Sequence, residues 1–154
     1  MNCKDKPKFG GDHTKKQKCL RRVCKAEVEK KQEGSKRRLL DERLMQLYSS
    51  ISEWTNAEGV QPIRVFLKKP SRKSYPDYYD VITKPIDMSM IDDRIKGAHY
   101  GTEEEMIDDF KLMFSNCRLY NEEHSEIYEY ADVLEAVLLA KAKEMGAGGK
   151  KQKI

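Results

Sequence analysis

Residues 102–121, TEEEMIDDFKLMFSNCRLYN, carry the strongest secondary-structure signal in this chain. Thr102 followed by Glu105 is a capping box, in which the hydroxyl and the carboxylate each accept a hydrogen bond from a backbone N–H group at the start of a helix. Apolar or aromatic side chains then recur every three or four residues, at Met106, Phe110, Met113, Cys117 and Tyr120. The spacing predicts a helix with one apolar face that must be buried.

Two segments before this helix show the same spacing. Residues 40–56 have apolar side chains at Leu40, Leu44, Leu47, Ile51 and Trp54. A shorter segment opens with Asp87 as a plausible N-cap and ends at Gly97, with Met90, Ile91 and Ile95 on its inner side. We therefore predict a first helix from residue 40 to near Asn56 or Gly59, and a second helix of about ten residues before Gly97.

A fourth helix is predicted after residue 121. Either His124 or Ser125 can cap it, and it runs until Gly146. Its apolar face consists of Ile127, Ala131, Leu134 and Leu138. Four amphipathic helices of these lengths bury their apolar faces most economically against one another, so the predicted fold class is an all-α bundle.

The segment between Gly59 and Asp87 breaks the helical pattern. Prolines at positions 62, 70, 76 and 85 prevent any long regular element. A loop approaching 30 residues is unusual in a compact domain and usually serves a function. Its aromatic side chains, Phe66, Tyr75, Tyr78 and Tyr79, must pack against other apolar surface.

Four motifs in this order are similar to those of the bromodomain family. They are Pro76-Asp77-Tyr78-Tyr79, Lys84-Pro85-Ile86-Asp87-Met88, Phe110 to Asn116, and Tyr120-Asn121. The resemblance covers roughly residues 40–144 and implies a left-handed four-helix bundle with a long loop between helices one and two. The segment Phe66-Leu67-Lys68-Lys69-Pro70-Ser71-Arg72 resembles the branch that contains polybromo and the Brahma-type remodelling ATPases.

The resemblance implies a reader of acetylated lysine on histone tails, in a nuclear chromatin-remodelling protein or complex whose other subunits are its partners. The amide of Asn121 would donate a hydrogen bond to the acetyl carbonyl, and Tyr78 would reach the same oxygen through a water molecule. Tyr120 would line the wall, and Ile127 would guard the mouth. Val65 and Phe66 would form the floor and shelf, with Tyr75 beside them. No buried carboxylate is expected in the pocket, so unmodified lysine should be rejected.

The shelf departs from the common family pattern at two places. Arg64-Val65-Phe66 stands where many bromodomains have Trp-Pro-Phe, and Tyr75 stands where they have leucine. We expect these differences to change which residues beside the acetyl-lysine fit, and to leave the acetyl-lysine contact itself unchanged.

Charge is distributed unevenly along the 154 residues. Residues 1–38 carry a net charge of +9, whereas residues 39–154 carry −5. We expect a basic, mostly disordered segment over residues 1–37, with at most a transient helix near residues 19–32, then a bromodomain over 38–145 and a flexible basic tail over 146–154. A second function stays open, in which the bundle is a scaffold and the basic segment binds DNA phosphates without sequence preference.

Other functions have little support in the sequence. No apolar run is long enough to span a membrane, and no nucleophile, phosphate-binding loop or cofactor motif indicates an enzyme. Cys117 and His124 could be read as a thiol nucleophile and its base, but a cysteine on the apolar face of a helix is better explained as a small buried side chain. The acids at residues 103–105 are better explained by the preference of acids for the first turn of a helix than by acid/base catalysis. Zinc binding by Cys3, His13, Cys19 and Cys24 is a minor alternative, because their spacing matches no compact tetrahedral pattern.

Overall fold

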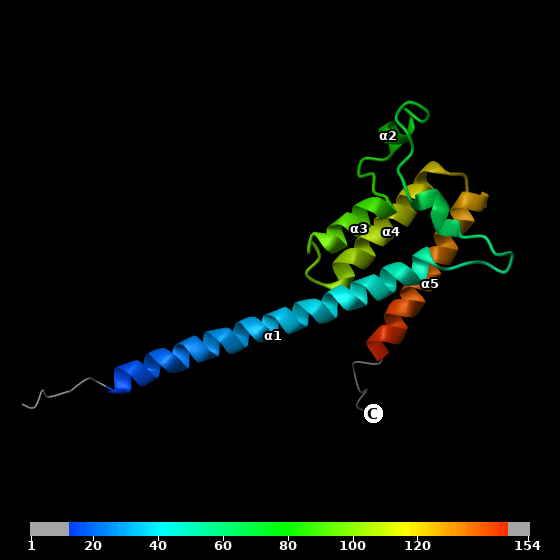
Figure 1. Cartoon of the computed structure of the whole chain (residues 1–154). Coiled ribbons are helices and arrows are strands. Elements are labelled where there is room, and N and C mark those ends of the chain that lie inside the picture. The colour runs from blue at the N-terminus through cyan, green and yellow to red at the C-terminus, as the bar shows by residue number, and fades with distance from the viewer. Residues whose placement is uncertain (1–12, 148–154) are drawn as a thin grey trace, which may run out of the picture. The chain divides into compact units, whose positions relative to one another are not determined.

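The structure is a computed structural model that describes residues 13–147, with side chains described for residues 21–146. Its elements are α1 (His13–Ser52), η1 (Pro62–Phe66), α2 (Tyr78–Val81), α3 (Met88–Lys96), α4 (Glu103–Tyr120) and α5 (Glu126–Ala147) (Figure 1). The described part of the chain contains no strand, so the predicted all-α class is confirmed there. Packing divides the chain into two units, Met1–Arg38 and Leu39–Ile154.

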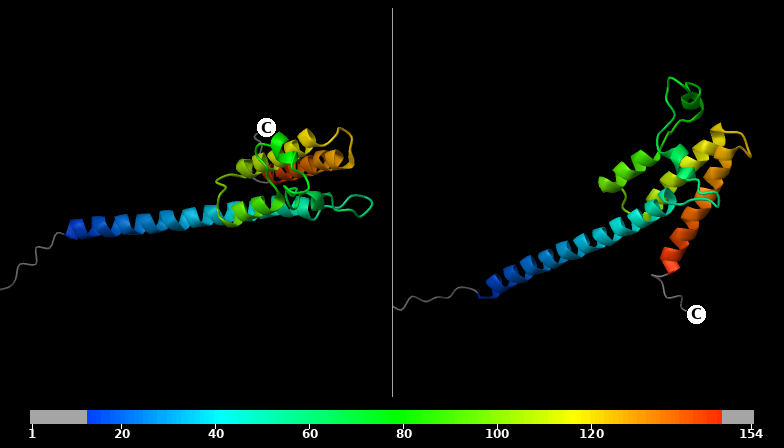
Figure 2. Two further views of the ribbon diagram at one scale, coloured as in Figure 1. Left: turned by 90° about the horizontal axis from the view of Figure 1, so that it is seen from above. Right: turned by 45° about the vertical axis from the view of Figure 1, so that its right-hand side comes forward.

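The second unit contains a bundle of four helices, namely the part of α1 from residue 39 onward, α3, α4 and α5. α4 packs against α5 and α3, and α5 also contacts η1 (Figure 2). The predicted apolar faces form its core, with these fully buried members: Leu44, Leu47, Ile51, Ile91, Met106, Phe110, Ala131, Leu134 and Leu138. Arg118 on α4 forms ion pairs with Asp132 and Glu135 on α5, which join the two helices at the surface.

The predicted starts of α4 and α5 are confirmed at the atomic level. The Thr102 hydroxyl accepts from the Glu105 N–H at 3.4 Å, and the Glu105 carboxylate accepts from the Gly101 N–H at 2.8 Å. In the usual capping box this carboxylate accepts from the N–H of the N-cap residue, which is Thr102, so here the donor lies one residue earlier. At the start of α5, the Ser125 hydroxyl accepts from the Tyr128 N–H at 3.4 Å, which selects Ser125 over His124 as the cap.

The long loop between α1 and α3 contains two short helices, η1 and α2, where we expected no helix. Pro62 begins η1, because its fixed φ and missing N–H suit the first turn of a helix. Two contacts of Tyr79 hold the loop together: its hydroxyl donates to the Pro70 carbonyl at 2.5 Å, and the Arg72 guanidinium lies 4.1 Å from its ring centroid. Tyr79 therefore acts as a packing residue of this loop.

The expectation of disorder is wrong for residues 13–37, because α1 begins at His13 instead of near residue 40. Lysine, arginine, glutamate, glutamine and alanine dominate this segment, and each has a high intrinsic preference for helix. Residues 21–36 are all exposed, so composition and not burial accounts for their helical state. Residues 1–12 and 148–154, which complete the predicted flanking segments, lie outside the described part of the chain.

None of the described helices is long and apolar enough to cross a membrane.

Candidate functional site

A cavity of about 300 Å³ lies in the second unit, between the long loop and the end of α4. Its lining includes all seven residues predicted from the sequence: Val65, Phe66, Tyr75, Tyr78, Tyr120, Asn121 and Ile127. Seven residues that were not predicted to line it complete the wall: Lys68, Lys69, Pro70, Ile86, Asp87, Met113 and Cys117. The structure thus gathers residues up to 62 positions apart in the chain around one hollow.

Asn121 lies at the C-terminal end of α4, where the backbone leaves the helix with an extended conformation. Its backbone N–H donates to the Cys117 carbonyl at 3.0 Å, and its side-chain amide nitrogen donates to the same oxygen at 2.9 Å. A weaker contact of 3.6 Å joins this nitrogen to the Cys117 sulfur. These contacts fix the orientation of the amide in the cavity wall.

Tyr78 and Tyr120 form the aromatic part of the wall. Their ring centroids are 4.9 Å apart with nearly perpendicular planes, a favoured geometry for aromatic pairs. Tyr78 is only 7% exposed, and burial raises the pKa of its phenol, with smaller contributions from neighbouring groups. The Tyr120 hydroxyl contacts both carboxylate oxygens of Asp77 at 3.2 Å, so the Pro-Asp-Tyr-Tyr motif positions this side chain.

Apolar side chains form the floor of the cavity. Phe66 is buried and meets Phe114 of α4 edge-on, with ring centroids 5.5 Å apart. Ile86 and Met113 are also buried and continue this surface. Met113 and Cys117 precede Asn121 by eight and four residues, so helical spacing along α4 could have identified both from the sequence.

Asp87 corrects the expectation that the pocket lacks a buried carboxylate. It is 4% exposed, it caps α3, and it also lines the cavity. One oxygen accepts from the Met90 N–H at 2.9 Å and the Ser89 hydroxyl at 2.7 Å, while the other accepts from the Lys69 N–H at 2.9 Å. Burial alone would raise the pKa of Asp87, but these hydrogen bonds outweigh it and hold the pKa below its ordinary value.

The rim of the cavity is exposed and carries charge. Val65 is 45% exposed, Tyr75 50% and Ile127 38%, so these predicted shelf and mouth residues are accessible to a ligand. Lys68 contributes a positive charge on the loop side. Asn121, which lines the cavity, is followed in the chain by two exposed acids, Glu122 and Glu123.

Asn116 was missed as a positioning residue. It is buried, and its side-chain amide donates to the Lys84 carbonyl at 2.8 Å, which ties α4 to the segment before α3. Ile86 and Asp87, two residues that line the cavity, follow Lys84 after Pro85. Nothing in the spacing of Asn116 indicates this bond, because its acceptor is a backbone carbonyl 32 residues earlier.

Neither thiol chemistry nor metal binding finds support among the described residues. Burial raises the pKa of the Cys117 thiol to about 11, and this thiol donates to the Ile127 carbonyl at 3.4 Å. The His124 side chain is 83% exposed, and the described residues include no cluster of His, Cys, Asp or Glu that could hold a metal ion. Cys3 and the side chains of His13 and Cys19 lie outside the described part of the chain, as does any zinc site that they would form.

The second unit is a helical bundle, and its long loop and helix ends enclose a small, largely apolar cavity. Comparison with known protein families identifies the class of protein that has this arrangement. A bromodomain family profile matches residues 45–133, and the chain belongs to this family. Bromodomains are readers of acetyl-lysine, so this chain is an acetyl-lysine reader by family.

Comparison with individual proteins shows which bromodomain proteins this chain is similar to. The chain is 41% identical over 123 residues to the SWI/SNF chromatin-remodeling complex subunit snf22 of Schizosaccharomyces pombe, covering 80% of this chain and 6% of that protein. It is 37% identical over 113 residues to the chromatin structure-remodeling complex subunit snf21 of the same yeast, covering 73% of this chain and 9% of that protein. The predicted similarity to remodelling subunits is confirmed, and the chain spans less than a tenth of either relative.

A solved structure confirms the fold. The bromodomain from human BAZ1A superposes with a TM-score of 0.61 at 32% sequence identity, over 68% of this chain and 95% of that chain. The left-handed four-helix bundle predicted from the motifs is therefore the fold of the second unit.

Proposed function

We propose that this bromodomain binds acetylated lysine in histone tails, as a module of a chromatin-remodelling protein in the nucleus. The observation that carries the proposal is the convergence of Asn121, Tyr78 and Tyr120 on one cavity with an apolar floor. An acetyl-lysine side chain is an uncharged amide on an apolar stem. A mostly apolar pocket with a few placed polar groups suits such a ligand.

The amide of Asn121 is the donor that we assign to the acetyl carbonyl. A side-chain amide has two N–H donors, and the Cys117 carbonyl at 2.9 Å uses one of them. The nearby Cys117 sulfur, at 3.6 Å, is a weak acceptor, so the second donor remains available to a ligand oxygen. Because the first bond already orients the amide, binding costs less conformational entropy than it would for a mobile side chain.

Tyr78 is the second polar group of the proposed site. A tyrosine hydroxyl is protonated at neutral pH, and burial raises the pKa of this one further, so it can donate a hydrogen bond to a water molecule that bridges to the acetyl carbonyl. One net hydrogen bond contributes about 1 kcal/mol, and burial of the acetyl group with a few methylenes adds about 2 to 4 kcal/mol. After the cost of association, we expect a dissociation constant of roughly tens of micromolar.

Unmodified lysine fits this cavity poorly. Its ammonium group has no acceptor to offer Asn121, and its desolvation costs roughly several kcal/mol unless a carboxylate compensates. Asp87 is the one carboxylate among the lining residues that the structure describes, and three donors already occupy its oxygens. Acetylation removes the charge and supplies the acceptor, so we expect it to decide binding.

The wider context rests on the relatives, two of which are subunits of chromatin-remodelling complexes. A weak single site becomes useful when several modules of one protein or complex engage the same chromatin together. This chain fits such a role, with histone tails as ligands and other remodelling subunits as partners.

The test is a chemical-shift titration of the ¹⁵N-labelled chain with an acetylated histone-tail peptide and its unmodified twin. We expect the acetylated peptide to shift the signals of Asn121, Tyr78 and Ile127, and the twin to leave them in place. Signals of core residues remote from the cavity, such as Leu134, serve as the internal control. Equal shifts with both peptides would contradict the proposed function.

A further inference from the structure

The first unit provides a surface that the acetyl-lysine pocket does not use. From His13 to Arg38 it consists of one continuous helical segment of α1. These 26 residues contain 11 lysines and arginines against 3 glutamates, a net charge of +8. At 1.5 Å per residue the segment is about 39 Å long, slightly more than one turn of B-form DNA.

No apolar face on this segment explains its helical state. Every residue from 21 to 36 is exposed, and the apolar Val23 and Val28 are 50% and 52% exposed. These two valines are five residues apart and so point to different sides of the helix. A coiled coil or a membrane-surface helix needs an apolar stripe, which is missing between residues 21 and 36.

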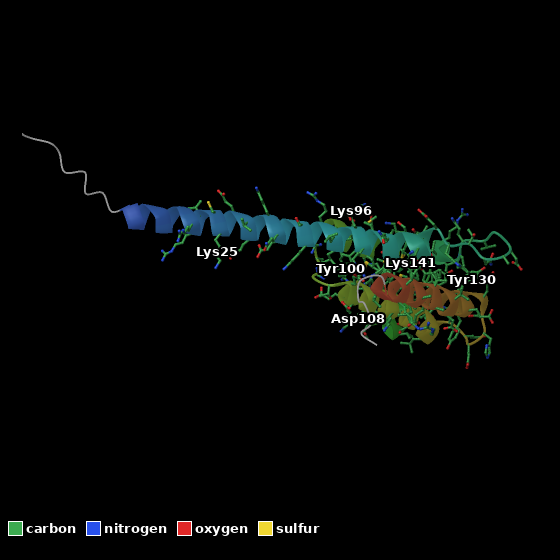
Figure 3. All side chains as sticks on the ribbon, turned by 90° about the horizontal axis from the view of Figure 1, so that it is seen from below. Lys25, Lys96, Tyr100, Asp108, Tyr130 and Lys141 are labelled. Atoms are coloured by element: carbon green, nitrogen blue, oxygen red, sulfur yellow. The ribbon has the colours of Figure 1, made fainter. Side chains whose placement is uncertain are left out.

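Positive side chains surround the segment. Lys25 and its neighbours project from several sides of α1 (Figure 3). Arg21, Lys25, Lys30 and Lys31 make no ion pair or hydrogen bond through their side chains with other described residues, although Glu27 and Glu29 stand within one helical turn of the lysines. Their charges are therefore available to an external polyanion.

We propose that residues 13–38 of α1 bind duplex DNA through its phosphates, without sequence preference. The +8 charge complements the polyanion, and the major groove of B-form DNA is wide enough to admit an α-helix. Duplex RNA fits less well, because its major groove is deep and narrow. This binding is separate from the proposed acetyl-lysine site, since the two sites share no residue and lie in different units.

The experiment measures binding of the full chain to a fluorescent 24-base-pair duplex as a function of salt concentration. One variant replaces Lys25, Lys30 and Lys31 with glutamine, which has a helix propensity close to that of lysine. The matched control replaces three exposed lysines of the second unit, Lys84, Lys111 and Lys143, with glutamine. Both variants lose the same net charge, so a difference between them locates the DNA site.

We expect the α1 variant to bind the duplex at least tenfold more weakly at about 0.1 M salt, and the control to stay within about twofold of the parent. The slope of log K against log salt should become shallower by roughly 3, because each phosphate that a lysine neutralises adds about 0.9 to its steepness. A third variant with arginine at the same three α1 positions should retain the parent affinity, and far-UV circular dichroism should show equal helicity in all four proteins.

Three results would overturn the proposal. One is an equal loss of affinity in the α1 variant and the control, which would make net charge the cause. Another is a poly-glutamate peptide that competes as well as unlabelled duplex, which would favour an acidic protein partner. The last is a strong preference for one duplex sequence over a scrambled one. The Asn121→Ala variant should bind DNA normally, so failure of the acetyl-lysine site and failure of this one are distinguishable.

Discussion

Replacing Asp87 tests how the long loop is held against α3, because its buried carboxylate accepts hydrogen bonds from backbone N–H groups of both. In the Asp87→Ala variant, the Met90 N–H loses its cap and the Lys69 N–H loses its acceptor. Loss of an N-cap costs about 1 kcal/mol, and a partly buried donor left without a partner costs roughly 1 to 3 kcal/mol. We therefore expect the free energy of unfolding to fall by about 3 kcal/mol.

The Asp87→Asn variant isolates the charge. Asparagine is also a good N-cap, so only the bond to Lys69 and the charge are affected, and we expect a loss of about 1 to 2 kcal/mol. Since the native pKa of Asp87 lies below its ordinary value, ionised Asp87 stabilises the fold above the unfolded pKa of about 4. That contribution is lost as the pH falls through the native pKa, so the parent and the asparagine variant should converge in stability at low pH.

Urea unfolding followed by the fluorescence of Trp54, the single tryptophan of the chain, measures both effects. Trp54 packs against the core, so its emission reports on unfolding of the bundle. An alanine variant within 0.5 kcal/mol of the parent, on the order of the effect of a neutral surface change, would refute the assigned bonds. A gap between the parent and the asparagine variant that widens as the pH falls would refute the sign of the pKa shift.

Three further variants probe the cavity itself. Tyr78→Phe keeps the ring and removes the hydroxyl, so acetyl-peptide affinity measured by calorimetry should fall about fivefold, for roughly 1 kcal/mol, without loss of stability. Phe66→Ala removes a buried ring that packs on Phe114, and its free energy of unfolding in urea should fall by about 3 to 5 kcal/mol. Glu122→Lys combined with Glu123→Lys should slow association of a basic acetylated peptide in stopped-flow measurements, and about 1 M salt should abolish the difference.

Much of the bundle could be predicted because its signals are local. A capping box, an N-cap and apolar residues spaced by three and four define α3, α4 and α5 to within about two residues, since each signal depends on a single turn of helix. The N-terminal part of α1 could not be predicted in this way. It lacks an apolar face, and an exposed segment with so many charged residues favours a prediction of disorder. The intrinsic helix preference of its residues is a weaker signal.

The cavity residues were predicted from the sequence motifs. The residues that were missed are those whose role depends on contacts with residues far away in the sequence. The seven expected side chains do surround one hollow, although their part in binding stays a prediction. Asp87 was identified only as a helix cap, because its bond to Lys69 joins residues 18 positions apart. The bond from Asn116 to the Lys84 carbonyl spans 32 positions and has no local signal.

The most direct test of the central claim is one set of calorimetric titrations that combines ligand acetylation with the Asn121→Ala variant. The parent should bind an acetylated histone-tail peptide with a dissociation constant of roughly tens of micromolar, and its unmodified twin at least tenfold more weakly. The variant should lose this discrimination while urea unfolding shows that it remains folded. Equal affinity of the parent for both peptides, or undiminished discrimination in the variant, would contradict the assignment of Asn121 as the acetyl-lysine donor.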